Sequence, residues 1–276
     1  MSARGRFLSG VVTVVLALAG FVGLGALPAA ASPPIIPYVA LGDSYAAGQG
    51  APPYDLDAAC KRSSKGYPTL LNNLESRIQL QANPTCTGAT TSSVAITQLP
   101  ALEPGTKLVT LTVGAANLGL SVVLAACFPT PTQLCQGAID NVRDNLLPRL
   151  GSELTALYPR VAVAAPGARI VVTGYPHLFE PESLPPTEAI IAERINRAID
   201  ALNSTIEGAV SVTNAADVNI HYVDVTEEFA GHGIFSTDQF INATGLDAFH
   251  PNDFGYQAYR DAISVALPGG WLKQLV

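Results

Sequence analysis

Residues 41–48 read LGDSYAAG, and the apolar run IIPYVAL, at residues 35–41, leads into them. The run predicts a buried β-strand, Gly42 and Asp43 predict a tight turn, and the small residues after Ser44 predict the start of a helix. Backbone N–H groups are unpaired at such a helix start and favour developing negative charge. Ser44 is therefore a candidate nucleophile, although Gly-Asp-Ser is also common turn chemistry in which Asp or Ser caps a helix.

The first 31 residues are predicted to be a signal peptide. Two arginines give this segment a positive start, residues 7–27 are almost wholly apolar, and the alanines at 29–31 fit a cleavage site. A membrane anchor is the alternative, because the apolar run is nearly long enough to span a bilayer. A helix-breaking proline and the cleavage signal favour export. We therefore expect a secreted, extracellular protein without a stable membrane anchor, in which residues 32–276 form a single domain.

The charge of the chain argues against some classes of partner. The whole chain has a formal net charge of −7, and loss of the segment that carries Arg4 and Arg6 leaves −9. Such an acidic chain is not expected to bind nucleic acid or an anionic membrane surface by electrostatic attraction. No spacing suggests a metal site, and no Gly-rich loop has phosphate-binding form, so neither a metal nor a cofactor is expected. A monomer is expected.

Four cysteines remain after the signal peptide. In an exported protein they are expected to form disulfides, and four cysteines allow three pairings. No Cys-x-x-Cys pair is present, which argues against zinc or redox chemistry. The four are Cys60, Cys86, Cys127 and Cys135.

Strand and helix patterns alternate along the rest of the chain. Apolar runs predict strands, and apolar residues spaced three or four apart predict helices. Pro148 should kink or split the helix predicted at 139–158. This alternation predicts an α/β fold with a parallel sheet covered on both faces, and sites in such sheets form beyond the carboxyl ends of the strands. The predicted strands are 35–41, 108–113, 168–176 with the strand's exit, and 220–225; the predicted helices are 67–74, 139–158, 187–207 and 253–267.

A second chemical signal is LDAFHP at residues 246–251. Asp247 and His250 are three residues apart just before a predicted helix, and a turn of this spacing can bring the carboxylate onto the imidazole Nδ1. Nε2 is then free to accept a proton from a serine. A surface turn with an incidental histidine is the alternative. The other histidines, at positions 177, 221 and 232, have contexts that favour structural or surface roles.

Together these motifs resemble the SGNH, or GDSL, hydrolases, and most closely the exported actinobacterial lipases and esterases. The resemblance implies a three-layer αβα sandwich with a flavodoxin-like parallel sheet. It spans nearly the whole mature chain, and the segments occur in the family's order. They are VALGDSY at 39–45, CTGAT at 86–90, VTLTVG at 109–114, VTGYP at 172–176 and DAFHP at 247–251.

The resemblance also implies roles for individual residues. Ser44 would be the nucleophile, His250 the general base and Asp247 the residue that orients it. The Gly88 N–H would join the Ser44 N–H in the oxyanion hole. The implied disulfides are Cys60–Cys86 and Cys127–Cys135.

One position departs from the family pattern. The family usually reads Gly-x-Asn-Asp after the second of these strands, and its asparagine donates to the oxyanion. Here Gly114 begins the sequence GAAN, so Ala116 occupies the asparagine position and Asn117 the next. Asn117 is the candidate side-chain donor despite the offset, and the alternative is that it only stabilises its own turn.

The sequence therefore predicts a secreted serine esterase or lipase that acts on a small-molecule or lipid ester through an acyl-enzyme on Ser44. The same chemistry would also suit an acyltransferase. A degenerate relative that binds a lipid or glycan without turnover is the alternative from another class, and Ala116 is its only support. The apolar residues between 118 and 124 are candidates either for an acyl groove or for ordinary core.

Overall fold

The computed structural model describes residues 34–127 and 133–267, so the predicted signal peptide, residues 1–31, lies outside the described residues. One parallel sheet crosses the described part, with the strand order β2-β1-β3-β4-β5. This order is flavodoxin-like, and the predicted α/β fold is confirmed. The strands are β1 (Ile36–Gly42), β2 (Ile78–Ala82), β3 (Leu108–Thr112), β4 (Arg169–Thr173) and β5 (Ile220–Val223).

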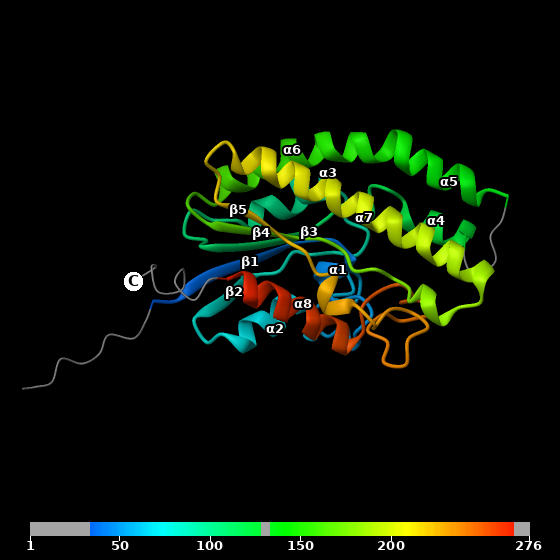
Figure 1. Cartoon of the computed structure of the whole chain (residues 1–276). Coiled ribbons are helices and arrows are strands. Elements are labelled where there is room, and N and C mark those ends of the chain that lie inside the picture. The colour runs from blue at the N-terminus through cyan, green and yellow to red at the C-terminus, as the bar shows by residue number, and fades with distance from the viewer. Residues whose placement is uncertain (1–33, 128–132, 268–276) are drawn as a thin grey trace, which may run out of the picture. The chain divides into compact units, whose positions relative to one another are not determined.

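Helices cover both faces of the sheet and complete the three layers. In Figure 1, α6 and α7 lie on one face, and α2 and α8 lie on the other. The helices are α1 (Ser44–Ala47), α2 (Tyr67–Leu74), α3 (Thr91–Ser93), α4 (Leu120–Cys127), α5 (Cys135–Asn141), α6 (Leu147–Ala164), α7 (Pro186–Asn214) and α8 (Asp253–Ala266). Short 3-10 or π turns cover Val94–Gln98, Leu99–Ala101, Val142–Leu146, Pro181–Ser183 and Glu227–Phe229.

The predicted strands occur near their expected positions, but β2 was not predicted. It lies at the edge of the sheet and alternates apolar with polar side chains, so its sequence lacks the continuous apolar run of a buried strand. The helix predicted at 139–158 is interrupted by the π turn Val142–Leu146, directly before Pro148 at the start of α6. The helix predicted at 187–207 continues to Asn214.

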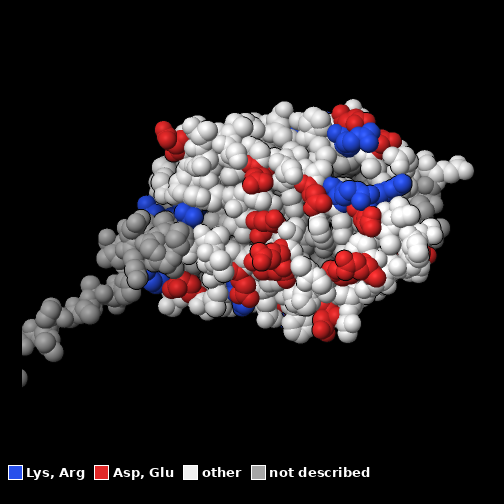
Figure 2. Space-filling model, in the orientation of Figure 1, with Lys and Arg blue, Asp and Glu red and all other residues white. Residues whose placement is uncertain are grey.

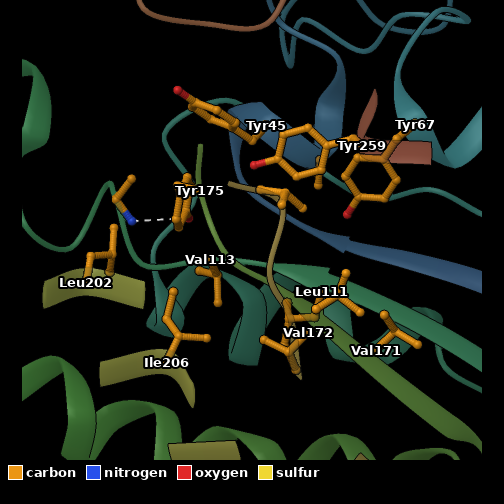
Figure 3. Close-up of a cluster of buried hydrophobic side chains, with 14 of the residues drawn as sticks. Tyr45, Tyr67, Leu111, Val113, Val171, Val172, Tyr175, Leu202, Ile206 and Tyr259 are labelled. Atoms are coloured by element: carbon orange, nitrogen blue, oxygen red, sulfur yellow. Dashed lines mark hydrogen bonds between the residues drawn. The ribbon is translucent and has the colours of Figure 1, made fainter. Parts of the chain in front are cut away.

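The core lies on both sides of the central strands. Figure 3 shows the rings of Tyr45, Tyr67 and Tyr259 grouped on one side of the strands, and Leu202 and Ile206 of α7 on the other. All five side chains are buried. The tyrosine rings pack against one another by edge and by stacking, with centroids 5.6 Å apart for Tyr67 and Tyr259. The carboxyl ends of β1 and β3 are therefore held in a rigid setting.

Charges are sparse on the molecule's surface. In the face drawn in Figure 2, acidic side chains lie in small separate groups, basic ones occur in few places, and wide uncharged areas lie between them. Within residues 34–127 and 133–267, no helix is long and apolar enough to cross a membrane. The same residues contain no cluster of three or more His, Cys, Asp or Glu that could hold a metal ion.

Candidate active site

Ser44 stands at the turn between β1 and α1, and this turn requires a glycine. Gly42 has φ +136°, and a Cβ there would lie 2.2 Å from the Thr112 carbonyl oxygen of the neighbouring strand. Only glycine tolerates both the conformation and the close approach. The turn places Ser44 between β1 and β3, where the strand order reverses and ligands of this sheet type bind.

The histidine that follows the sheet reaches this serine. His250 Nε2 lies 2.9 Å from Ser44 Oγ. On the other side of the ring, Nδ1 lies 3.0 Å from the Ala248 carbonyl oxygen. Because a carbonyl only accepts hydrogen bonds, this contact places the proton on Nδ1 and leaves Nε2 as an acceptor for the serine hydroxyl. The two side chains predicted to react are thus brought together.

Asp247, the predicted hydrogen-bond partner of His250 Nδ1, contacts another residue. The Asp247 carboxylate contacts Lys61, with Oδ1 2.7 Å from Nζ, and the Ala248 carbonyl takes the position at Nδ1. The expected Asp247–Nδ1 hydrogen bond is therefore wrong for this structure. The local backbone explains the difference, because Phe249 has φ +66° and the turn closes on a carbonyl instead of on a side chain.

Burial and the neighbouring charges and hydrogen bonds shift the pKa values of His250 and Asp247. Burial lowers the pKa of His250 to about 4, and the nearby Asp247 charge opposes part of that fall. Burial raises the pKa of Asp247, but hydrogen bonds from Lys61 and Tyr54, together with the Lys61 charge, outweigh it and hold that pKa below its usual value. Asp247 thus acts on the imidazole through its charge while its oxygens bind other groups.

Asp43, next to the serine, lies in the predicted tight turn and also caps α1. It accepts the Tyr45 N–H at 3.0 Å, and its other oxygen accepts the Tyr175 hydroxyl at 2.6 Å. The same hydroxyl accepts the Ala115 N–H at 3.2 Å, so it connects the serine turn to the loop after β3. Asp43 is almost fully buried, and burial raises its pKa to about 7. No local sequence signal identifies Tyr175 as its partner.

Two backbone donors face the serine cavity. Gly88 has φ +72° in a turn closed by the Ala89 N–H on the Cys86 carbonyl. The Cys86 N–H donates to the Gly42 carbonyl at 3.1 Å, which ties this turn to the serine turn. Among the described residues, no acceptor is found for the Ser44 N–H or the Gly88 N–H. Because both residues line the cavity beside Ser44, their N–H groups are the candidate donors to an oxyanion.

Asn117 turns away from this cavity. Its amide nitrogen donates to Thr91 Oγ1 at 2.8 Å and to Glu153 Oε2 at 2.6 Å, and its oxygen accepts the Thr91 N–H at 3.1 Å. Both amide hydrogens are used, so the geometry does not support the predicted donor role. Ala116, in contrast, lines the same cavity as Ser44 and Gly88. The alternative, in which Asn117 only stabilises its own turn, does not describe these contacts either, because its partners Thr91 and Glu153 belong to α3 and α6.

The cavity beside Ser44 is partly apolar. Its volume is about 610 Å³, and it lies between α4 and the loop that carries His250. Leu120 and Leu124 come from α4, and Leu246 and Phe249 from the loop. Of the apolar candidates between 118 and 124, the remaining three do not line it: Leu118 and Val123 are buried, and Val122 is exposed.

The disulfides pair as the resemblance implied. Cys60 is bonded to Cys86, and Cys127 is bonded to Cys135. The first bond holds the turn that carries Gly88, and the second joins the end of α4 to the start of α5.

Comparison with known proteins agrees with this geometry. The sequence profile of the GDSL-like lipase/acylhydrolase family matches residues 40–258 of the chain. The chain belongs to this family. As a member of the GDSL-like family it is a carboxylic ester hydrolase, as the sequence predicted.

Relatives of this GDSL-like protein come from Streptomyces. A lipase of Streptomyces rimosus is 33% identical over 225 residues, which cover 79% of this chain and 81% of the relative. The crystal structure of an extracellular lipase from S. rimosus aligns with a TM-score of 0.74 and 29% identity, covering 84% of this chain and 99% of that one. Phospholipase A1 from Streptomyces albidoflavus aligns with a TM-score of 0.76 and 32% identity over the same shares.

Proposed function

We propose that this chain is a secreted serine esterase or lipase that cleaves carboxylic esters through an acyl-enzyme on Ser44. The observation that carries the proposal is the 2.9 Å contact between Ser44 Oγ and His250 Nε2, with the opposite ring nitrogen held by the Ala248 carbonyl. A neutral imidazole in this tautomer can accept the serine proton at Nε2.

The reaction would proceed in two displacements. Ser44 Oγ attacks the ester carbonyl carbon as its proton moves to His250 Nε2, and the oxyanion forms near the Ser44 and Gly88 N–H groups. His250 then donates this proton to the leaving alcohol as the ester C–O bond breaks. Water repeats the sequence on the acyl-enzyme and releases the acid. The Asp247 charge stabilises the imidazolium formed in each displacement.

The substrate proposed is a lipid-derived ester. The apolar residues Leu120, Leu124 and Phe249 line the cavity and suit an acyl chain. Relatives named lipase and phospholipase A1 support this substrate class, and the extracellular lipase of S. rimosus supports secretion. The two disulfides also fit an oxidising compartment.

A reactive probe tests the nucleophile without knowledge of the natural ester. The purified protein should be labelled by a fluorophosphonate and should hydrolyse a short-chain nitrophenyl ester, and Ser44→Ala should lose both activities. His250→Ala should lose nearly all turnover, and the double variant should be little worse, because the two residues act as one unit. Ser121→Ala is the matched control, since Ser121 lines the same cavity. Turnover retained by Ser44→Ala would refute the mechanism.

A further inference from the structure

Two loops bring the proposed base and the proposed oxyanion donor to Ser44. The glycine loop, residues 86–90, carries Gly88, and the histidine loop, residues 245–250, carries His250. Neither loop is part of a helix or strand. The serine turn supports each loop separately, because the Cys86 N–H donates to the Gly42 carbonyl at 3.1 Å and the Tyr45 hydroxyl donates to the Phe249 carbonyl at 2.6 Å. Contacts that cross between the loops fix their separation directly.

Lys61 makes such a contact. Its ammonium donates to Asp247 Oδ1 at 2.7 Å and to the Leu246 carbonyl at 3.4 Å, both in the histidine loop. The residue before it, Cys60, is bonded to Cys86 of the glycine loop. The Cys60 carbonyl also accepts the Thr87 N–H of that loop at 3.1 Å. Two consecutive residues thus hold both loops.

A second side chain reinforces this connection. Gln49, which is 5% exposed, accepts the Thr87 hydroxyl at 2.6 Å and donates to the Leu246 carbonyl at 3.5 Å. Gln49 and Lys61 therefore converge on one carbonyl of the histidine loop. Gln49 also lines the serine cavity, whereas Lys61 does not, so Lys61 is the residue whose positioning effect can be measured without touching the substrate.

We propose that Lys61 is a positioning residue that fixes the histidine loop relative to the glycine loop, and so sets the distance between the proton acceptor and the oxyanion donors. This inference rests on the proposed function. It explains why Asp247 faces Lys61 instead of His250 Nδ1. The Lys61 and Asp247 side chains are 26% and 25% exposed, so water still screens this ion pair and its stabilising effect is modest. A misplacement of about 1 Å at a reacting group, in contrast, can cost on the order of 10²-fold in rate. The effect should therefore appear in catalysis more than in stability.

The charges around His250 predict a kinetic signature. The charged groups that act on it are Asp247, which raises its pKa, and Lys61, which lowers it; Ser44 and the ring of Tyr45 are its uncharged neighbours. Removing Lys61 should raise the pKa of His250 and move the acidic limb of kcat/KM to higher pH. Removing the Asp247 charge should move that limb to lower pH.

Kinetics of Lys61→Met on a short-chain nitrophenyl ester test the proposal in the full chain. We expect kcat to fall by roughly 10- to 100-fold while KM changes less than about threefold, because the loss is in alignment. Lys61→Arg should restore most of the rate by keeping the cation. Lys65→Met is the matched control, since Lys65 pairs with Asp253 of α8 at 2.6 Å and with neither loop; its kcat should stay within about twofold of the wild type.

Asp247→Asn provides a second variant, which removes the same ion pair from the opposite side. It should lower kcat at least as far, because it also removes the charge that stabilises the imidazolium, and it should shift the acidic limb in the opposite direction. The double variant with Lys61→Met should be little slower than Asp247→Asn alone. Amide hydrogen exchange should be faster in the histidine loop of Lys61→Met and unchanged in α8.

The outcomes separate this inference from the proposed function. If Lys61→Met matches Lys65→Met in kcat, in the acidic limb and in amide exchange, Lys61 does not position the histidine loop. If the wild-type protein neither hydrolyses the ester nor reacts with a fluorophosphonate, the proposed function is wrong. In that case the exchange comparison still decides whether Lys61 holds the loop.

Discussion

Among single residues, Ala116 is the one that most affects the expected rate. It lies in the cavity with Ser44 and Gly88, but its methyl side chain cannot donate a hydrogen bond, and the Asn117 amide donates to Thr91 and Glu153 instead. The oxyanion would then depend on two backbone N–H groups. Loss of one donor typically costs ~10²–10³ in turnover, so the geometry describes a slower enzyme and not an inactive one.

This assignment predicts opposite effects for two neighbouring substitutions. Asn117→Ala should lower the free energy of unfolding by about 1–3 kcal/mol, because it leaves the Thr91 N–H without its acceptor and removes one donor from Glu153, and should change kcat little. Ala116→Asn should raise kcat, by up to ~10²-fold if the new amide reaches the oxyanion. Urea denaturation and ester kinetics measure both. A large fall in kcat for Asn117→Ala, with unchanged stability, would restore Asn117 as the donor.

The pKa of His250 sets the acidic limb of activity. Burial lowers it to about 4, so His250 stays neutral and able to accept a proton at pH 5. We expect kcat/KM to fall only as the pH drops through about 4, as measured in a pH–rate profile. A midpoint near 6.5 would show that His250 is as solvated as in an unfolded chain.

The lowered pKa of His250 also makes the free energy of unfolding depend on pH. The folded state resists protonation of His250, while the unfolded chain binds that proton as the pH falls below about 6.5. The contribution of the neutral histidine to stability is therefore complete above pH 6.5 and is lost as the pH falls toward 4.

At the level of elements, the disulfides join segments that are not part of the sheet. Cys127–Cys135 joins α4 to α5, and α4 supplies Leu120 and Leu124 to the cavity. Cys60–Cys86 joins the segment of Lys61 to the glycine loop. The two bonds close loops with sequence separations of 8 and 26 residues.

Removing each bond should have a different effect. In the chain-entropy account, alanine at Cys60 and Cys86 costs up to roughly 3.5 kcal/mol, and alanine at Cys127 and Cys135 up to roughly 2.5 kcal/mol. Only the first pair should also lower kcat at temperatures where the protein stays folded, because that bond fixes the segment of Lys61 to the glycine loop, whereas the second joins α4 to α5. Chemical denaturation and ester kinetics test this. Equal kinetic effects of the two pairs would contradict it.

At the scale of the whole molecule, the sheet brings distant segments to one place. Ser44 follows β1, the loop with Ala116 follows β3, and both lie where the strand order reverses. His250 arrives from just before α8. Parallel strands put all of these at the same edge, which is why residues separated by some 200 positions can act on one ester.

The proposed export of the chain predicts its mature form. Expressed with residues 1–31 in an exporting host, the secreted protein should begin at Ser32, because the alanines at 29–31 fit signal-peptidase cleavage. Intact mass and N-terminal sequencing of the culture supernatant measure this. A protein that stays in the membrane fraction with residues 1–31 attached would instead support the anchor alternative.

The central strands and the candidate pair Ser44 and His250 could be predicted from the amino-acid sequence. Buried parallel strands must be continuously apolar, so β1, β3 and β4 were visible as runs, while the half-polar edge strand β2 was not. Ser44 was visible because its turn needs Gly42, and His250 because its motif precedes a helix. Each motif alone left an alternative open, a helix cap for Ser44 and a surface turn for His250, and their joint resemblance to one family singled out the pair.

Only the tertiary structure decided the partners of these residues. Asp247 accepts from the Lys61 ammonium, and Glu153 of α6 accepts from the Asn117 amide, because packing brings these donors within hydrogen-bond reach of carboxylates distant in sequence. The imidazole is held by the carbonyl of Ala248, and since every residue has a carbonyl, no residue type could have revealed it. A side chain's hydrogen bonds depend on which groups packing brings near it, and the local sequence does not contain that information.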